Sequence, residues 1–184
     1  MPGRENKIYL TFDDGPVPEI TPQVLQILKS YDSKATFFCV GDNVGKHPEL
    51  FSEIRTEGHA RGNHTYNHLR AWTTSAGEYM RNVEACRVIN ESRLFRPPHG
   101  QLTPGLIREL GKNYRIIMWS VLSGDFDKRL RPEQCLDITL RYAKAGSIVV
   151  FHDSIKASRN MLYALPLFLE HFKSRGFESA TMDE

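Results

Sequence analysis

The sequence lacks the features that mark membrane-spanning and disulfide-rich proteins. No apolar run approaches the roughly 20 residues that a bilayer-spanning helix needs, and the N-terminal residues 1–7 contain no apolar segment of the kind found in signal peptides. The three cysteines, Cys39, Cys86 and Cys135, are odd in number and widely spaced. We therefore expect small buried core residues, not a disulfide framework or a zinc knuckle.

Charge of neither sign predominates. The 24 Lys and Arg residues against 22 Asp and Glu give a formal net charge of +2, and the basic residues are scattered along the chain. This pattern predicts no nucleic-acid partner and no membrane-surface cluster. Without a leader the chain is expected to be cytoplasmic, but its native compartment stays open because a leader or flanking segment can be absent from these residues.

Linkers and low-complexity stretches are also missing, so residues 1–184 are expected to form one domain and to act as a monomer. Apolar, β-prone runs alternate with helix-like segments; the expected strands are residues 7–12, 35–40, 59–63, 93–96, 115–119, 147–151 and 177–181. Thr21-Pro22 and Thr103-Pro104 pair an N-cap with a first-turn proline, which predicts helix starts. The alternation indicates an α/β fold with a parallel sheet and right-handed crossovers.

The side chains capable of chemistry fall at the ends of several different expected strands. Asp13 and Asp14 follow the first, Arg96 the fourth, Asp125 the fifth and His152 the sixth. Ligands and catalytic groups of barrels lie at the carboxyl ends of many strands. Seven repeats with this distribution favour a (β/α)7 barrel, with a flat doubly wound sheet as the alternative.

Two short segments, residues 11–16 (TFDDGP) and 62–68 (GNHTYNH), offer two adjacent carboxylates and two imidazoles. These are ligands for borderline divalent metals, and three protein ligands with an open fourth position are typical of a catalytic metal site. A carboxylate left over beside the metal can act as a base. Helical i, i+4 spacing predicts that His64 and His68 share one face of a helix, and Gly15-Pro16 predicts a turn directly after the aspartates.

Five segments together resemble the ordered motifs of the polysaccharide deacetylases, the NodB-homology group of the carbohydrate esterases (family 4). They are residues 11–16, 64–68, 95–100 (FRPPHG), 119–125 (WSVLSGD) and 150–153 (VFHD). The resemblance implies a distorted, often incomplete (β/α) barrel. It also implies a single divalent metal and hydrolysis of an acetyl group from an N-acetylated or O-acetylated sugar.

The same resemblance implies roles for individual residues. Asp14, His64 and His68 would bind the metal, Asp13 would be the general base, and Arg96 would hold that base ionised and oriented. Zinc is the expected metal, while cobalt, nickel and iron also suit this ligand set.

For the departing group, the resemblance makes His152 the general acid and Asp125 the carboxylate that raises the pKa of its imidazole. The backbone N–H of His99 would help to stabilise the oxyanion. The sequence departs from the family pattern at Leu122, where an aspartate is usual, and at Phe126, where a tryptophan is usual. Both changes alter the expected wall of the pocket, so they bear on substrate identity more than on activity.

The expected activity is removal of acetyl groups from N-acetylglucosamine-containing glycans such as peptidoglycan or chitooligosaccharide. An O-acetyl esterase acting on xylan or a similar glycan would use the same site. A third possibility is a catalytically weak, carbohydrate-binding homologue. Tyr66 and Trp72 are candidate sugar-stacking residues, although aromatic residues belong more often to the core. The remaining histidines, His47, His59 and His171, are expected at the surface or in structural positions.

Overall fold

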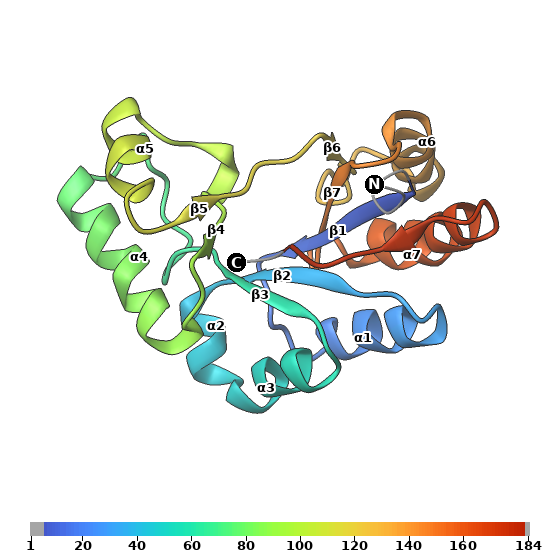
Figure 1. Ribbon diagram of the computed structural model, residues 1–184, viewed down its shortest axis with the longest axis horizontal. Helices are drawn as coiled ribbons and strands as arrows, with labels where there is room; N and C mark the ends of the chain where they lie inside the picture. Colours follow the sequence, from blue (N-terminus) through green and yellow to red (C-terminus); the bar gives the residue numbers. More distant parts are fainter. Residues whose placement is uncertain (1–5, 183–184) are drawn as a thin grey trace.

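The computed structural model describes residues 6–182, so the ends of the expected 1–184 domain and most of the segment considered for a leader lie outside it. One parallel sheet forms its centre (Figure 1). Its strands are β1 (Lys7–Asp13), β2 (Ala35–Cys39), β3 (Ala60–Asn63), β4 (Leu94–Phe95), β5 (Arg115–Ile116), β6 (Val121–Leu122), β7 (Ile148–His152) and β8 (Glu178–Ser179). Along the sheet they follow the order β5-β4-β3-β2-β1-β7-β6, and β8 pairs with the start of β1.

The sheet curls into an incomplete barrel, as the resemblance implied. β5 and β6 are consecutive in the chain but lie at opposite ends of the strand order, so within residues 6–182 the barrel is open between them. The chain between these two strands crosses the gap at the top of Figure 1. The strand expected at 115–119 is present but shorter, because its pairing with β4 stops at Ile116. A further strand that was not expected, Val121–Leu122, pairs with β7.

Helices cover the outer face of the sheet (Figure 1). They are α1 (Thr21–Ser30), α2 (Gly41–Lys46), α3 (Pro48–Thr56), α4 (Ala76–Asn90), α5 (Pro104–Leu110), α6 (Pro132–Tyr142) and α7 (Ser158–Lys173), with a short 3-10 turn at Pro98–Gly100. Thr103 caps α5 as expected, because its side chain accepts a hydrogen bond from the Leu106 N–H. Thr21 does not cap α1; it is the first helical residue, and its hydroxyl bonds to Asp153 instead.

Successive residues of each strand point to opposite faces of the sheet. Phe12 stacks on Phe37 and Phe151 and belongs to the large apolar cluster that also contains buried residues of α1 and α7. Phe38, Leu94, Ile117 and Met182 form a separate cluster. These clusters bury the apolar surface of β1, β2 and β7, which fixes the register of the strands whose ends carry Asp13 and His152.

No helix within residues 6–182 has the length and apolar character needed to cross a bilayer.

Candidate active site

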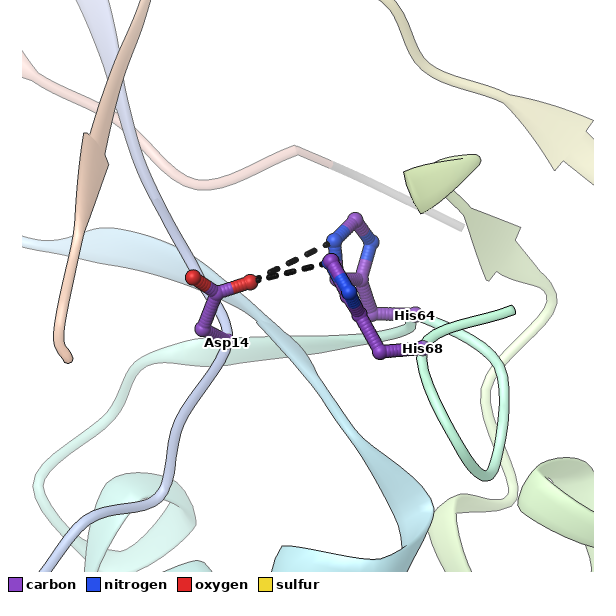
Figure 2. Close-up of side chains that lie close together, drawn as sticks. All are labelled: Asp14, His64 and His68. Carbon is purple, nitrogen blue, oxygen red and sulfur yellow. Dashed lines mark ion pairs between the residues drawn. The ribbon is translucent and has the colours of Figure 1, made fainter. Parts of the chain in front are cut away.

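Three potential metal ligands come together at the carboxyl edge of the sheet. Asp14 directly follows β1, and His64 and His68 lie in the loop after β3 (Figure 2). The Asp14 Oδ1 atom is 3.2 Å from His68 Nε2 and 3.8 Å from His64 Nε2. One potential ligand atom from each residue lies within 4.8 Å of the others. The three side chains therefore surround a point that one ion could occupy.

The expected helix at residues 64–68 is absent; the two histidines lie on a loop. Thr65 and His68 have left-handed φ values of 62° and 56°, which break the helical path. Asn82 of α4 holds the loop, because its side-chain oxygen accepts hydrogen bonds from the N–H groups of Tyr66 (2.8 Å) and Asn67 (3.0 Å). The two imidazoles converge as expected, but through this loop geometry.

The protonation states suit a divalent metal. His64 Nδ1 lies 2.8 Å from the Arg96 carbonyl oxygen, which can only accept, so the imidazole donates there and leaves its Nε2 lone pair facing Asp14. Burial lowers the pKa of His64 to about 4, so the ring is neutral at neutral pH. Burial raises the pKa of Asp14, but a hydrogen bond from His68 and the charges that His64 and His152 carry when protonated outweigh this in the acidic range and lower it overall. Neutral imidazole and ionised carboxylate are the forms that bind metals.

Arg96 is fully buried beside Asp13. Its Nη1 atom donates to Asp13 Oδ1 at 2.8 Å and to Thr11 Oγ1 at 2.7 Å. Its Nε atom donates to the Ile117 carbonyl at 3.2 Å, and its guanidinium lies 4.1 Å from the centroid of the Phe38 ring. These bonds fix the guanidinium, so Arg96 orients one carboxylate oxygen of Asp13 through a charge-assisted hydrogen bond.

His152 forms a second fixed pair with Asp125. Its Nδ1 lies 2.7 Å from Asp125 Oδ1, and its backbone N–H donates to Asp125 Oδ2 at 2.7 Å. Burial lowers the pKa of the imidazole, but the hydrogen bond and charge of Asp125, with the charges of Asp13 and Asp14, raise it overall to about 9. The ring therefore carries a proton at neutral pH and presents its other nitrogen, Nε2, as a donor.

These groups border one cavity of about 440 Å³. Its lining residues are Asp13, Asp14, His64, His68, Pro97, His99, Gly100, Trp119, Leu122, Phe126, Val150, His152 and Lys156. Arg96 and Asp125 lie behind the wall, in contact with Asp13 and His152. The expected site residues are thus brought together, and Leu122 and Phe126 line the wall as expected.

His99 lies at a backbone position with a φ of 58°, and its ring centroid is 4.7 Å from that of His68. Among the other histidines, His59 is structural: its Nδ1 accepts a hydrogen bond from the Ala35 N–H at 3.2 Å. Tyr66 and Trp72 are not among the lining residues, and Trp72 is 69% exposed.

The sequence reasoning missed Lys156. This residue lines the cavity, and its ammonium lies 5.4 Å from the centroid of the Phe126 ring. Its position four residues after His152 is the signal that could have identified it.

The barrel fold, the potential metal site and the two buried pairs around it are typical of hydrolases that use a metal. Comparison with known proteins identifies the family. Residues 1–114 match the family model for polysaccharide deacetylase, and the chain belongs to this family. A peptidoglycan-N-acetylglucosamine deacetylase of Bacillus cereus is 34% identical over 192 residues, which span 100% of this chain and 90% of the relative. A chitooligosaccharide deacetylase of Azorhizobium caulinodans is 32% identical over 157 residues, or 81% of this chain and 74% of that protein.

Solved structures of related proteins are similar to this protein over nearly its whole length. The crystal structure of the Bc1960 peptidoglycan N-acetylglucosamine deacetylase, in complex with 4-naphthalen-1-yl-N-oxidanyl-benzamide, superposes with a TM-score of 0.92 at 29% identity. The match covers 98% of this chain and 88% of that chain. It therefore includes the segments with Asp125 and His152, which lie beyond the residues matched by the family model.

Proposed function

We propose that this protein is a metal-dependent deacetylase that hydrolyses the acetamide of N-acetylglucosamine units in a glycan such as peptidoglycan or a chitooligosaccharide. The observation that carries the proposal is the convergence of three kinds of group on one cavity. They are a potential metal site, a carboxylate held by a buried arginine, and an imidazole with a raised pKa held by a buried carboxylate. The activities named for the relatives support the acetylated-sugar substrate.

Asp14, His64 and His68 would hold the metal, and Asp13 would be the base. A divalent metal in this position supplies a Lewis acid that polarises an acyl carbonyl and lowers the pKa of water. Asp13 accepts a proton from water as the water oxygen bonds to the acyl carbon. Arg96 holds Asp13 in place, because its Nη1 occupies one carboxylate oxygen and leaves the other for the proton. Zinc is our first proposal for the metal, with cobalt, nickel and iron as alternatives.

His152 would be the acid. When the carbon–nitrogen bond breaks, its Nε2 proton passes to the departing amine of the sugar, which would otherwise leave as an unstable anion. Asp125 holds the ring from its Nδ1 side and helps to keep it protonated beforehand. The backbone N–H of His99 is proposed to donate to the oxyanion in the tetrahedral intermediate.

Acetate release from a panel of substrates tests the proposal. The panel contains N-acetylated chitooligosaccharides, peptidoglycan and acetylxylan, each with metal-stripped and zinc-reloaded protein. We expect release from an N-acetylated glycan only after reloading. His68→Ala is the control that should bind little zinc and release no acetate while remaining folded.

The other outcomes separate the alternatives. Release from acetylxylan alone would identify an O-acetyl esterase, and glycan binding without release would identify a carbohydrate-binding homologue. We also propose that residues 1–184 form a single catalytic domain. We propose that this domain acts as a monomer, which the molecular mass in solution tests.

A further inference from the structure

Asp153 follows His152 and has no role in the mechanism above. Its side chain is 1% exposed, and it is not among the residues that line the cavity. Its Oδ1 accepts a hydrogen bond from the Gly15 N–H at 3.0 Å, and its Oδ2 accepts one from the Thr21 hydroxyl at 2.7 Å. The Thr21 oxygen in turn accepts from the Val17 N–H at 2.7 Å. Asp153 therefore binds both ends of the loop between β1 and α1.

Asp14 lies at the start of this loop in an unusual backbone conformation. Its φ is 85°, a region that non-glycine residues adopt only when their surroundings hold them there. The Asn43 side chain donates to the Asp14 carbonyl at 2.8 Å, and the Gly15 N–H, next along the chain, donates to Asp153. Asp153 is thus one of two side chains that fix the peptide group directly after the Asp14 Cα atom.

The approach of Asp153 to this loop is close. A Cβ atom at Gly15 would lie 1.9 Å from Asp153 Oδ2, so only glycine leaves room for the carboxylate. The backbone is bound as well, because the Asp153 N–H donates to the Asp13 carbonyl at 3.1 Å. The end of β7 therefore holds the backbone of Asp13 and, through Gly15, that of Asp14.

We propose that Asp153 is a positioning residue for the metal site: it fixes the left-handed backbone at Asp14 and so sets the Asp14 carboxylate against His64 and His68. This inference rests on the proposed function, because it concerns the metal that the function requires. Since Asp153 is the neighbour of His152, one strand end places both the proton donor and the loop that carries a ligand. If Asp153 had only a structural role, it would stabilise the fold without changing the affinity of the site for a metal ion.

Cobalt titration separates the two roles. Co²⁺ suits the same ligands, and its visible absorption reports the geometry around the ion. Partners outside the ligand shell of a metal site typically change its affinity by about 10- to 100-fold. We expect a loss of that size for Asp153→Ala, together with a changed visible spectrum. Asp153→Asn keeps one acceptor for the Gly15 N–H, so its affinity should lie between those of Asp153→Ala and the wild type.

Stability is measured in parallel by urea unfolding of each metal-free variant. Leu28→Ala is the matched control, because Leu28 is a fully buried residue of α1, the helix that begins at Thr21. It should lower stability and leave the Co²⁺ affinity unchanged. If Asp153→Ala does not fold, Asp153→Asn and Thr21→Val carry the test, since Thr21→Val removes the hydroxyl that donates to Asp153.

Wild-type affinity and spectrum in the folded Asp153 variants would overturn the inference while leaving the proposed function intact. The same holds if Leu28→Ala loses as much affinity as Asp153→Ala at equal stability. If the wild type itself bound no Co²⁺ and released no acetate, the proposed function would fail first, and the positioning role with it.

Discussion

Asp13 and Asp14 are adjacent in the sequence, but their side chains have different partners. Asp13 is paired with the buried Arg96, whereas Asp14 faces the two imidazoles. Successive residues of an extended chain point to opposite sides, and the φ of 85° at Asp14 turns the second carboxylate toward the loop after β3. This difference in surroundings allows one carboxylate to accept a proton and the other to bind a metal.

Substituting the two aspartates should give different results. Asp13→Asn is expected to keep zinc near one equivalent but to lose most of the rate, because an amide cannot accept the proton of water. Asp14→Asn should instead lower the zinc content, since a neutral amide is a weaker ligand than a carboxylate. Metal analysis beside acetate release measures both effects. Equal zinc loss in the two variants would make Asp13 a ligand and place the base elsewhere.

The contact between Asp125 and His152 allows a prediction of how the rate depends on pH. The pKa of His152 is raised to about 9, and the acid role needs the protonated ring, so activity should fall as the pH rises through that value. Asp125→Asn removes the charge that raises the pKa, so the alkaline limb of the rate profile should move to lower pH. The profile of kcat against pH measures this shift. An alkaline limb unchanged in Asp125→Asn would assign it to a group other than His152.

At the scale of elements, strand ends were easier to predict than loops. The end of β1 was predictable because an apolar run stops at two aspartates, and the end of β7 because one stops at His152. The loop at residues 64–68 was not, because its shape depends on hydrogen bonds to Asn82, a residue of a later helix. β5 and β6 have two residues each, too few to show the alternation that identifies a strand.

β3 supplies a prediction about packing. A Cβ atom at Gly62 would lie 2.4 Å from the Cδ1 atom of the Phe38 ring, on which the Arg96 guanidinium rests. Gly62→Ala should therefore lower the free energy of unfolding by about 1–3 kcal/mol, the usual cost of overpacking a core. It should also reduce activity, because Arg96 must move with the ring.

Gly77→Ala is the matched control for this prediction. Gly77 lies in α4, where the nearest atom to an added Cβ is the flexible Arg81 Nη1 at 3.6 Å. Replacing glycine by alanine within a helix should stabilise the fold by about 0.5–1 kcal/mol. Urea unfolding measures both variants, and equal stability of the two would show that the Phe38 ring yields without cost.

At the scale of the whole molecule, the motifs predicted the family and an incomplete barrel, but not that the barrel is open between β5 and β6. The motifs record which side chains meet at one edge of the sheet. They contain no information on which strands pair at its two ends, since that depends on the packing of short strands. Lys156 was missed because it enters the cavity from the turn between β7 and α7, which lies beyond the last motif.

The buried ionisable groups predict how the stability of the metal-free protein varies with pH. Burial lowers the pKa of His59 and of His64 from 6.5 to about 4, so the unfolded state binds more protons at these sites in that range and stability rises with pH. Burial raises the pKa of Asp153 from 3.8 to about 8, and the pKa of His152 is raised from 6.5 to about 9. At these two sites the folded state binds more protons, so stability falls as the pH rises through those ranges.

Below pH 6.5 the rise in stability that His59 and His64 cause outweighs the fall that Asp153 causes. Above pH 6.5 the falls that Asp153 and His152 cause remain. The free energy of unfolding should therefore be greatest near pH 6.5. Urea unfolding at about pH 4.5, 6.5 and 8.5 measures it. His59→Gln keeps an acceptor for the Ala35 N–H. It should make the free energy of unfolding rise less steeply with pH below this maximum. A continuous rise in stability up to pH 8.5 would contradict this assignment.

Chemical labelling of the three free cysteines can report which parts of the protein unfold. Cys39, Cys86 and Cys135 lie in β2, α4 and α6, and all are buried. Burial raises their thiol pKa values, to about 12 for Cys86 and Cys135, so each sulfur is both shielded and protonated in the folded state. Alkylating reagents attack the thiolate, so labelling must wait for local or global unfolding. Mass spectrometry of a timed labelling reaction would then reveal which of the three elements opens first.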